Sequence, residues 1–360
     1  IYTLHQLSEE GHVYFLYDPL VERCREILGV VREPVVRAIG RLNTDRQIII
    51  EDINAGVENF KPNNKAVYLT RFYQCETGIS NRLKALLSTP KLIRELDSAR
   101  AIRWVQQQLS FDLAENQIAA VQCALENKVM VITGGPGTGK TTIINAILKI
   151  FSKLDINMML AAPTGRAAKR MSEMTGHEAK TIHRLLEYSL HKHGFQRDEK
   201  NPLDCDLLIV DEASMIDTIL MYHLLKAIPA TATCILVGDV NQLPSVGAGN
   251  VLNDIITSGS VAVIELNEIF RQAKASRIIV NAHKINAGDL PSFGQSERFD
   301  PNNDFYFIEQ DDPEKVLGII LELANRRIPE RFGVDAIDDI QVLTPMHKGV
   351  VGAGNLNDQL

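Results

Sequence analysis

The sequence lacks any long apolar run, since no stretch approaches the roughly 18 consecutive apolar residues that a membrane-spanning helix needs. We therefore exclude an integral membrane protein and expect no membrane partner. No apolar run follows basic residues at the start of the chain, so we also expect no secretory signal. The first residue is Ile1 rather than Met, as expected for a piece of a longer chain.

Cysteine is scarce, and acidic residues outnumber basic ones. The five cysteines form no CxxC pair and are scattered along the chain: Cys24, Cys75, Cys123, Cys205 and Cys234. This spacing argues against a zinc ribbon or a disulfide framework and fits a reducing cytoplasm. The net charge of −7 argues against a protein that coats nucleic acid through bulk charge alone, but it leaves room for a local basic groove.

The chain has no internal repeat, and its 360 residues are typical of two or three domains. Residues 1–88 are predicted to form a small mixed unit, in which Asp18 caps a helix and a second helix runs from Glu33 towards Leu42. Two β-rich runs follow, Gln47–Glu51 and Lys65–Thr70. Helices followed by a long hairpin are the outline of a winged helix, and a generic α+β adaptor fits the same pattern equally well.

Residues 89–110 are predicted to be a helical connector, and from about residue 111 strands and helices alternate. The apolar strand candidates are Val129–Thr133, Met158–Ala162, Leu207–Val210, Cys234–Val237, Val261–Leu266, Phe305–Ile308 and Ile340–Thr344. Short apolar strands spaced by helices indicate an α/β domain, a parallel sheet with helices on both faces.

The strongest motif is the segment 134–141, GGPGTGKT, which fits GxxxxGK[ST] and follows a predicted strand. Glycines let such a loop point its N–H groups at phosphate oxygens, at the positive end of the next helix. Lys140 is expected to reach the β- and γ-phosphates, and the Thr141 hydroxyl is expected to bind Mg²⁺. The cofactors predicted are thus ATP and Mg²⁺. The expected nucleotide-binding residues are Gly135, Pro136, Gly137, Thr138, Gly139, Lys140, Thr141 and Thr142.

Two further strand ends carry polar groups. The run LLIVDE ends in Asp211 and Glu212, which a parallel sheet presents at its carboxyl edge, where α/β ligands bind. We expect Asp211 to hold Mg²⁺ and Glu212 to polarise an attacking water. After the next strand, Gln242 could sense the γ-phosphate, and a plain loop residue is the alternative.

The set GGPGTGKT, LAAPTGRAAKRMSE, TIHRLL, LLIVDEASMID, VGDVNQLPSVGAGNVL and LNEIFRQA resembles the superfamily 1 DNA helicases of the RecD/TraA type, the exodeoxyribonuclease V alpha-subunit family, over about residues 105–360. The resemblance implies a RecA-like first motor lobe over 111–335 and the truncated start of a second lobe over 336–360. It also implies a bacterial cytoplasmic DNA helicase that moves 5′ to 3′ on single-stranded DNA, acts at duplex junctions in recombination or repair, and has repair-complex subunits as partners.

The resemblance assigns two more residues to the nucleotide. Gln117 matches the glutamine that reads the adenine edge in such motors. Arg271 matches an arginine that stabilises the γ-phosphate as charge develops. Outside this context, Gln117 would be an ordinary residue at a helix start and Arg271 an ordinary surface charge.

The resemblance also predicts DNA contacts. Thr164, Gly165 and Arg166 match a segment that touches the single-strand backbone, and a hydroxyl, a glycine N–H and an arginine after a strand suit phosphate. Thr181 and His183 match a second contacting block, although His183 could instead pack beside a helix start.

By the same resemblance, residues 187–202 form a short hairpin that separates strands, with Phe195 as its wedge. His191 and His193 lie two apart in this segment, but no partner cluster suggests a metal site.

Two other functions fit the same residues. One is a related motor that acts on RNA, since 2′-hydroxyl contacts leave no mark in a single sequence. The other is a nucleotide-gated DNA-binding or assembly module of a repair complex, because the second lobe is absent for the most part and its arginine with it. For the same reason, ATP hydrolysis by this chain alone is an open question.

Overall fold

The computed structural model describes residues 1–54, 64–109, 111–191, 194–268, 276–293 and 303–360. The chain divides into two compact units, one of residues 1–275 with 279–290 and the other of residues 276–278 with 291–360. Residues 291–335, which we expected within the first motor lobe, therefore belong to the second unit. Within the described ranges, every helix is too short or too polar to cross a membrane.

A small α+β domain begins the first unit. Its elements are α1 (Tyr2–Glu9), β1 (Tyr14–Leu16), α2 (Tyr17–Leu28), α3 (Arg32–Thr44), β2 (Ile48–Asp52) and β3 (Lys65–Leu69). The strands form an antiparallel sheet of order β1-β3-β2, in which Ile48 pairs with Leu69 and Asp52 with Lys65. This arrangement of helices and hairpin confirms the winged-helix outline predicted from the sequence.

Two details of this domain differ from the prediction. Asp18 does not cap α2, because the helix already begins at Tyr17, the residue before it. The Asp18 carboxylate instead pairs with Arg32 of α3. Asp18 still lies in the first turn, where a negative charge favours the helix dipole. The sequence analysis did not predict helix α1 or strand β1. For β1 the reason is its length, since a three-residue edge strand is too short to show the alternation of apolar and polar residues that marks a strand.

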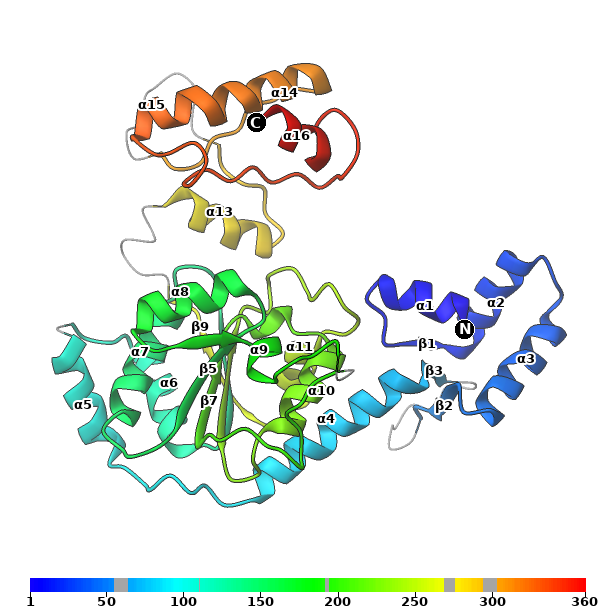
Figure 1. Cartoon of the computed structure of the whole chain (residues 1–360), viewed down its shortest axis with the longest axis horizontal. Coiled ribbons are helices and arrows are strands. Elements are labelled where there is room, and N and C mark those ends of the chain that lie inside the picture. Colours follow the sequence, from blue (N-terminus) through cyan, green and yellow to red (C-terminus); the bar gives the residue numbers. More distant parts are fainter. Residues whose placement is uncertain (55–63, 110, 192–193, 269–275, 294–302) are drawn as a thin grey trace. The chain divides into compact units, whose positions relative to one another are not determined.

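The largest sheet of the first unit has six strands, and helices pack around it (Figure 1). Its strands are β4 (Val129–Gly134), β5 (Met158–Ala162), β6 (Ala179–Thr181), β7 (Leu207–Val210), β8 (Thr233–Gly238) and β9 (Ala262–Leu266). The order is β6-β5-β7-β8-β4-β9, and every pair is parallel. The predicted parallel α/β sheet is confirmed, with β6 as a strand that the sequence did not reveal.

Helices cover both faces of this sheet, because alternate residues of each strand point to opposite sides. In β4, Val131 joins one buried cluster, whereas Met130 and Ile132 join the other. The first face is covered by α4 (Thr70–Ser88), α9 (Ile182–Leu185), α10 (Thr218–Ala227) and α11 (Val251–Thr257). The second is covered by α5 (Ser98–Leu109), α6 (Glu115–Glu126), α7 (Lys140–Phe151) and α8 (Gly165–Thr175).

Helix α4 joins the small domain to the sheet. Phe72, near its start, is buried in the core of the small domain, while Leu83 and Leu86 are buried against the sheet. The predicted connector that follows is itself part of the sheet domain, since Ile102 and Val105 of α5 lie in the core of the second face. The small domain is thus held to the sheet domain by a continuous helix.

The second unit contains α14 (Pro313–Glu322), a π-helical turn η2 (Leu323–Arg327), α15 (Ile328–Phe332) and α16 (Ala353–Gln359). The strands expected at Phe305–Ile308 and Ile340–Thr344 are not formed, so this prediction was wrong. Rings pack on rings instead, with Phe293 4.5 Å from Phe307 between centroids. An apolar run becomes a strand only beside another strand, and these runs have no such partner in the described part of the unit.

Two glycines inside helices test the α4 contact. A Cβ at Gly78 of α4 would overlap the ring of Tyr222 on α10, whereas a Cβ at Gly40 of α3 would meet open space. We expect Gly78→Ala to lower the free energy of unfolding by about 1–3 kcal/mol through overpacking. We expect Gly40→Ala to raise it by about 0.5–1 kcal/mol, because alanine favours the helix. Equal effects of the two substitutions in urea unfolding would contradict the close packing of α4 on α10.

Candidate nucleotide-binding site

The polar groups predicted from separate motifs meet at the carboxyl edge of the parallel sheet. Strand β4 runs into the phosphate loop, β7 ends before Asp211, and β8 ends before Asp239. These strands are neighbours in the order β7-β8-β4, so their ends lie side by side. This edge is where open parallel sheets bind ligands.

The phosphate loop has the backbone conformation that its glycines permit. Gly137 and Gly139 have φ of 75° and 85°, in the left-handed region that favours glycine, and Gly139 is the residue before the first turn of α7. The Thr138 hydroxyl donates a hydrogen bond of 2.8 Å to the Gly135 carbonyl and closes the loop. The loop thus wraps at a helix N-terminus, a place where backbone N–H groups bind phosphate. Pro136 lies in the loop, and Thr141 and Thr142 lie in the first turn of α7.

The Lys140 ammonium lies inside this loop. It donates hydrogen bonds of 2.5 Å to the Gly134 carbonyl and 3.0 Å to the Gly135 carbonyl. Burial lowers the pKa of Lys140, and the nearby carboxylates of Asp239, Glu212 and Asp211 oppose that shift. The charge is therefore surrounded by anionic groups and positioned to exchange two carbonyls for phosphate oxygens.

Asp211 and Glu212 lie together after β7. Burial raises the pKa of both carboxyls, and in Glu212 the charge of Asp211 adds to the rise. Glu212 has φ of 52°, an unfavourable conformation for a residue with a side chain, and its N–H donates to Asp211 Oδ1 at 2.9 Å. Its Oε2 is buried without a hydrogen-bond partner among the described residues.

These residues fit the nucleotide and the metal that the motifs imply. A phosphate cradle, a lysine and two carboxylates of raised pKa lie at one sheet edge, and the orphaned Oε2 of Glu212 is suited to a bound water. Asp211 and Thr141 carry oxygen atoms of the kind that Mg²⁺ prefers as ligands, and they are the residues that would hold it.

Gln242 donates a hydrogen bond to Asp239, a residue to which the sequence motifs assign no role. Asp239 is only 1% exposed, and its two oxygens accept from Asn241 N at 3.1 Å and from Gln242 Nε2 at 3.3 Å. The Gln242 side chain itself is exposed. Asp239 is also the main charge opposing the pKa shift of Lys140. The same carboxylate therefore accepts a hydrogen bond from Gln242 and attracts the ammonium of the phosphate loop.

Gln117 is 2% exposed and contacts the same loop from α6. Its Oε1 accepts from Ala114 N at 3.1 Å, and its Nε2 approaches the Thr138 carbonyl at 3.4 Å. The side chain thus caps the N-terminus of α6 and contacts the phosphate loop, beside the residues that would hold the nucleotide. Arg271, the remaining predicted nucleotide contact, lies outside the described residues.

The two predicted DNA-contacting blocks lie next to each other. Ala162 pairs with Thr181 at the ends of β5 and β6, so the segments after these strands are adjacent. Thr164 and Thr181 each cap the helix that follows, accepting from Ala167 N and Arg184 N at 3.2 Å. The remaining residues of the two blocks, Gly165, Arg166 and His183, are exposed.

The predicted hairpin is small. Its described part holds a single bridge, in which Ser189 and Gly194 exchange backbone hydrogen bonds of 2.9 and 3.0 Å, and His193 lies outside the described residues. Phe195 is partly buried against the core, 4.7 Å from the ring of His223 and 5.6 Å from that of His183. Its role as a wedge stays a prediction. The strongly exposed apolar side chain here is Leu190, at 76%.

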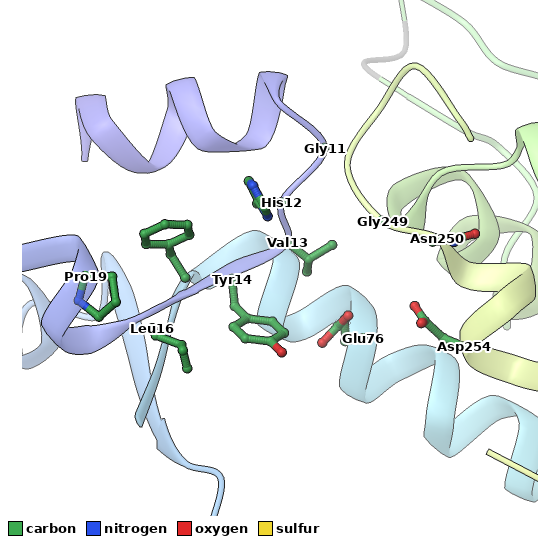
Figure 2. Close-up of a pocket in the computed structure, with 11 residues that line it drawn as sticks. Gly11, His12, Val13, Tyr14, Leu16, Pro19, Glu76, Gly249, Asn250 and Asp254 are labelled. Atoms are coloured by element: carbon green, nitrogen blue, oxygen red, sulfur yellow. The ribbon is translucent and has the colours of Figure 1, made fainter. Parts of the chain in front are cut away.

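A cavity of about 380 Å³ lies where the small domain meets the loop that leaves Gln242. Gly249 N donates to Gly11 O at 3.0 Å, and Ala248 is buried in the core of the small domain. Glu76 and Asp254 both line this cavity, and Figure 2 shows them on two different helices. Burial raises the pKa of both carboxyls, and the charge of Asp254 adds to the rise at Glu76.

Sequence reasoning missed the contribution of Arg170. This residue of α8 contributes a positive charge that lowers the pKa of both Asp211 and Glu212. No motif position distinguishes it from other basic residues of α8, so only the packing of that helix against the sheet edge reveals it.

Comparisons with known proteins agree with this geometry. A family model described as an AAA domain matches residues 117–248. The ATP-dependent RecD2 DNA helicase of Deinococcus radiodurans is 36% identical over 295 residues, which cover 82% of this chain and 38% of that protein. The RecBCD enzyme subunit RecD of Mycobacterium tuberculosis is 32% identical over 308 residues, which cover 76% of this chain and 50% of that protein.

Among solved structures, the Pif1 helicase from Candida albicans is similar at a TM-score of 0.40 and 24% identity, over 50% of this chain and 45% of that chain. The matched regions cover 38% of the RecD2 helicase and 50% of the RecD subunit, so the chain spans half or less of the length of these two relatives.

The cavity carboxyls give a pH-dependent prediction. The pKa of Glu76 is higher in the folded chain than its ordinary value, so the ionised carboxylate destabilises the fold above that pKa. We expect Glu76→Gln to raise the melting temperature at pH 8, and the difference from wild type to vanish as the pH falls below the ordinary glutamate pKa. Glu95→Gln, at an exposed carboxylate, is the control. A difference that persists at low pH would show that ionisation is not the cause.

Proposed function

We propose that this chain, a homologue of the RecD-type helicases over most of its length, is the ATP-binding portion of an ATP-dependent DNA helicase. The observation that carries the proposal is the convergence of the phosphate loop, the Asp211–Glu212 pair and Gln242 at one sheet edge. The segments that would contact DNA follow the two neighbouring strands of the same sheet. The residues proposed to bind nucleotide and the segments proposed to bind single-stranded DNA therefore lie at the same edge of the sheet.

Nucleotide binding begins with the phosphate loop. Lys140 exchanges its hydrogen bonds with two loop carbonyls for phosphate oxygens, and the N–H groups of the loop complete the cradle. Thr141 and Asp211 would hold Mg²⁺, which supplies charge neutralisation to the phosphates. Gln117 would contact the adenine edge, as the family resemblance implies.

Hydrolysis rests on Glu212. Its carboxylate accepts a proton from the attacking water, and the raised pKa makes it a stronger base than an exposed glutamate. The orphaned Oε2 supplies the acceptor. Gln242 would orient the terminal phosphate, and Arg271 would stabilise the charge that develops there.

The mechanical output follows from the strands next to the site. The β5 and β7 strands pair directly, so Thr164–Arg166, which follow β5, lie one strand away from Glu212, which follows β7. The proposed substrate is single-stranded DNA at duplex junctions, with movement 5′ to 3′ and partners among repair-complex subunits. The direction and the partners rest on the family resemblance alone.

Glu212→Gln tests the motor. We expect this variant to bind ATP within about threefold of wild type and to lose turnover by about 100-fold or more, because the proton acceptor is removed. The measurement is steady-state ATP turnover with and without single-stranded DNA, on this chain and on any longer natural form of it. DNA-stimulated turnover in the wild type supports the proposal. Turnover indifferent to both DNA and RNA would contradict the translocating motor, and stimulation by RNA alone would contradict DNA as its substrate.

Gln117→Ala tests base recognition. We expect the preference for ATP over GTP to fall by about tenfold, since the side chain that reads the adenine edge is lost. Gln122→Ala is the matched control, because Gln122 is an exposed glutamine of the same helix that bonds to Glu126. An unchanged preference, measured by competition binding, would assign Gln117 to helix capping alone.

A further inference from the structure

A histidine distant in sequence from the motifs contacts the phosphate loop. His283 lies in α13 (Arg277–Asn286), which from Ile279 onward belongs to the same compact unit as the loop. Its ring packs on Gly135 so closely that a Cβ added there would lie 2.8 Å from Cε1 and 3.3 Å from Nε2. A side chain at position 135 would have to displace this imidazole.

The ring nitrogen at this contact is an orphan. Nε2 of His283 is buried and has no hydrogen-bond partner among the described residues. A buried donor or acceptor left unsatisfied is costly, and in native structures such a group calls for an explanation, such as a bound ligand or water. Because the nitrogen lies against a loop that is built to bind phosphate, the fitting partner is a phosphate oxygen.

The contact also indicates which end of the nucleotide is involved. Gly135 is the residue whose carbonyl accepts from the Lys140 ammonium at 3.0 Å, and a phosphate-loop lysine reaches the β- and γ-phosphates. Gln117, which would read the base, instead approaches the loop at Thr138. His283 is therefore on the terminal-phosphate side of the loop.

We propose that His283 is a nucleotide-binding residue, whose Nε2–H donates a hydrogen bond to a terminal phosphate oxygen of a nucleoside triphosphate. The inference rests on the proposed function, since it requires the loop to bind nucleotide. This hydrogen bond would add a nucleotide contact from α13, a helix that lies outside all of the sequence motifs. The contact distinguishes triphosphate from diphosphate and links α13 to the state of the nucleotide.

The test is equilibrium binding of two probes with Mg²⁺, a non-hydrolysable ATP analogue and ADP. We expect His283→Ala to weaken binding of the analogue about tenfold and to leave ADP within about twofold, because one charge-assisted hydrogen bond is lost. His283→Asn, which keeps a side-chain N–H donor, should recover part of the affinity. His5→Ala, at an exposed histidine of α1, is the matched control, and Lys140→Ala should lose both ligands.

Each result has a distinct meaning. Equal loss of the analogue and ADP in His283→Ala would overturn the inference, since it would indicate a general effect on the loop. Unchanged binding of both would overturn it too, while leaving the proposed function intact. Absence of nucleotide binding by the wild type would overturn both proposals together.

Gly135 gives a second measurement, which tests the contact from the loop side. A methyl group at this position would collide with the imidazole, so Gly135→Ala should displace the ring and lower triphosphate affinity. The double variant Gly135→Ala/His283→Ala should be no weaker than His283→Ala alone, because the collision is then relieved. Strictly additive losses would contradict the contact.

Discussion

The parallel pairing of the six strands is the constraint on which the rest depends. In a parallel sheet every strand ends at the same edge, so segments far apart in sequence become neighbours there. The phosphate loop, the acids after β7 and Asp239 after β8 meet for this reason alone. Helices must then cover both faces, and the buried clusters on the two sides of β4 pack these helices against the sheet.

The chemistry of the edge follows from burying charges of both signs close together. Burial lowers the pKa of Lys140 and raises those of Asp211 and Glu212. The lysine charge opposes the rise at the two carboxyls, and their charges oppose the fall at the lysine. The orphaned Oε2 of Glu212 shows that the hydrogen bonding of this set is incomplete within the described residues. The site is thus prepared for a ligand that brings its own oxygens and charge.

The small domain is joined to this edge by two routes. Helix α4 runs from the core of one domain to the core of the other, and the loop that follows Gln242 ends with Ala248 buried in the small domain. The bond from Gly249 N to Gly11 O secures that loop. The small domain therefore holds one end of the loop that carries Gln242.

Local chemistry was readable from the sequence, whereas contacts between distant segments were not. The run GGPGTGKT, the LLIVDE strand and the alternation of strands with helices predicted the parallel fold, the loop before α7 and the acid pair after β7, because each depends on residues adjacent in the chain. Asp18 was expected as a cap but pairs with Arg32, and Phe305–Ile308 forms no strand, since partners distant in sequence decide both outcomes. Only the tertiary structure placed His283 against Gly135, because no spacing rule connects a helix after β9 with a loop after β4.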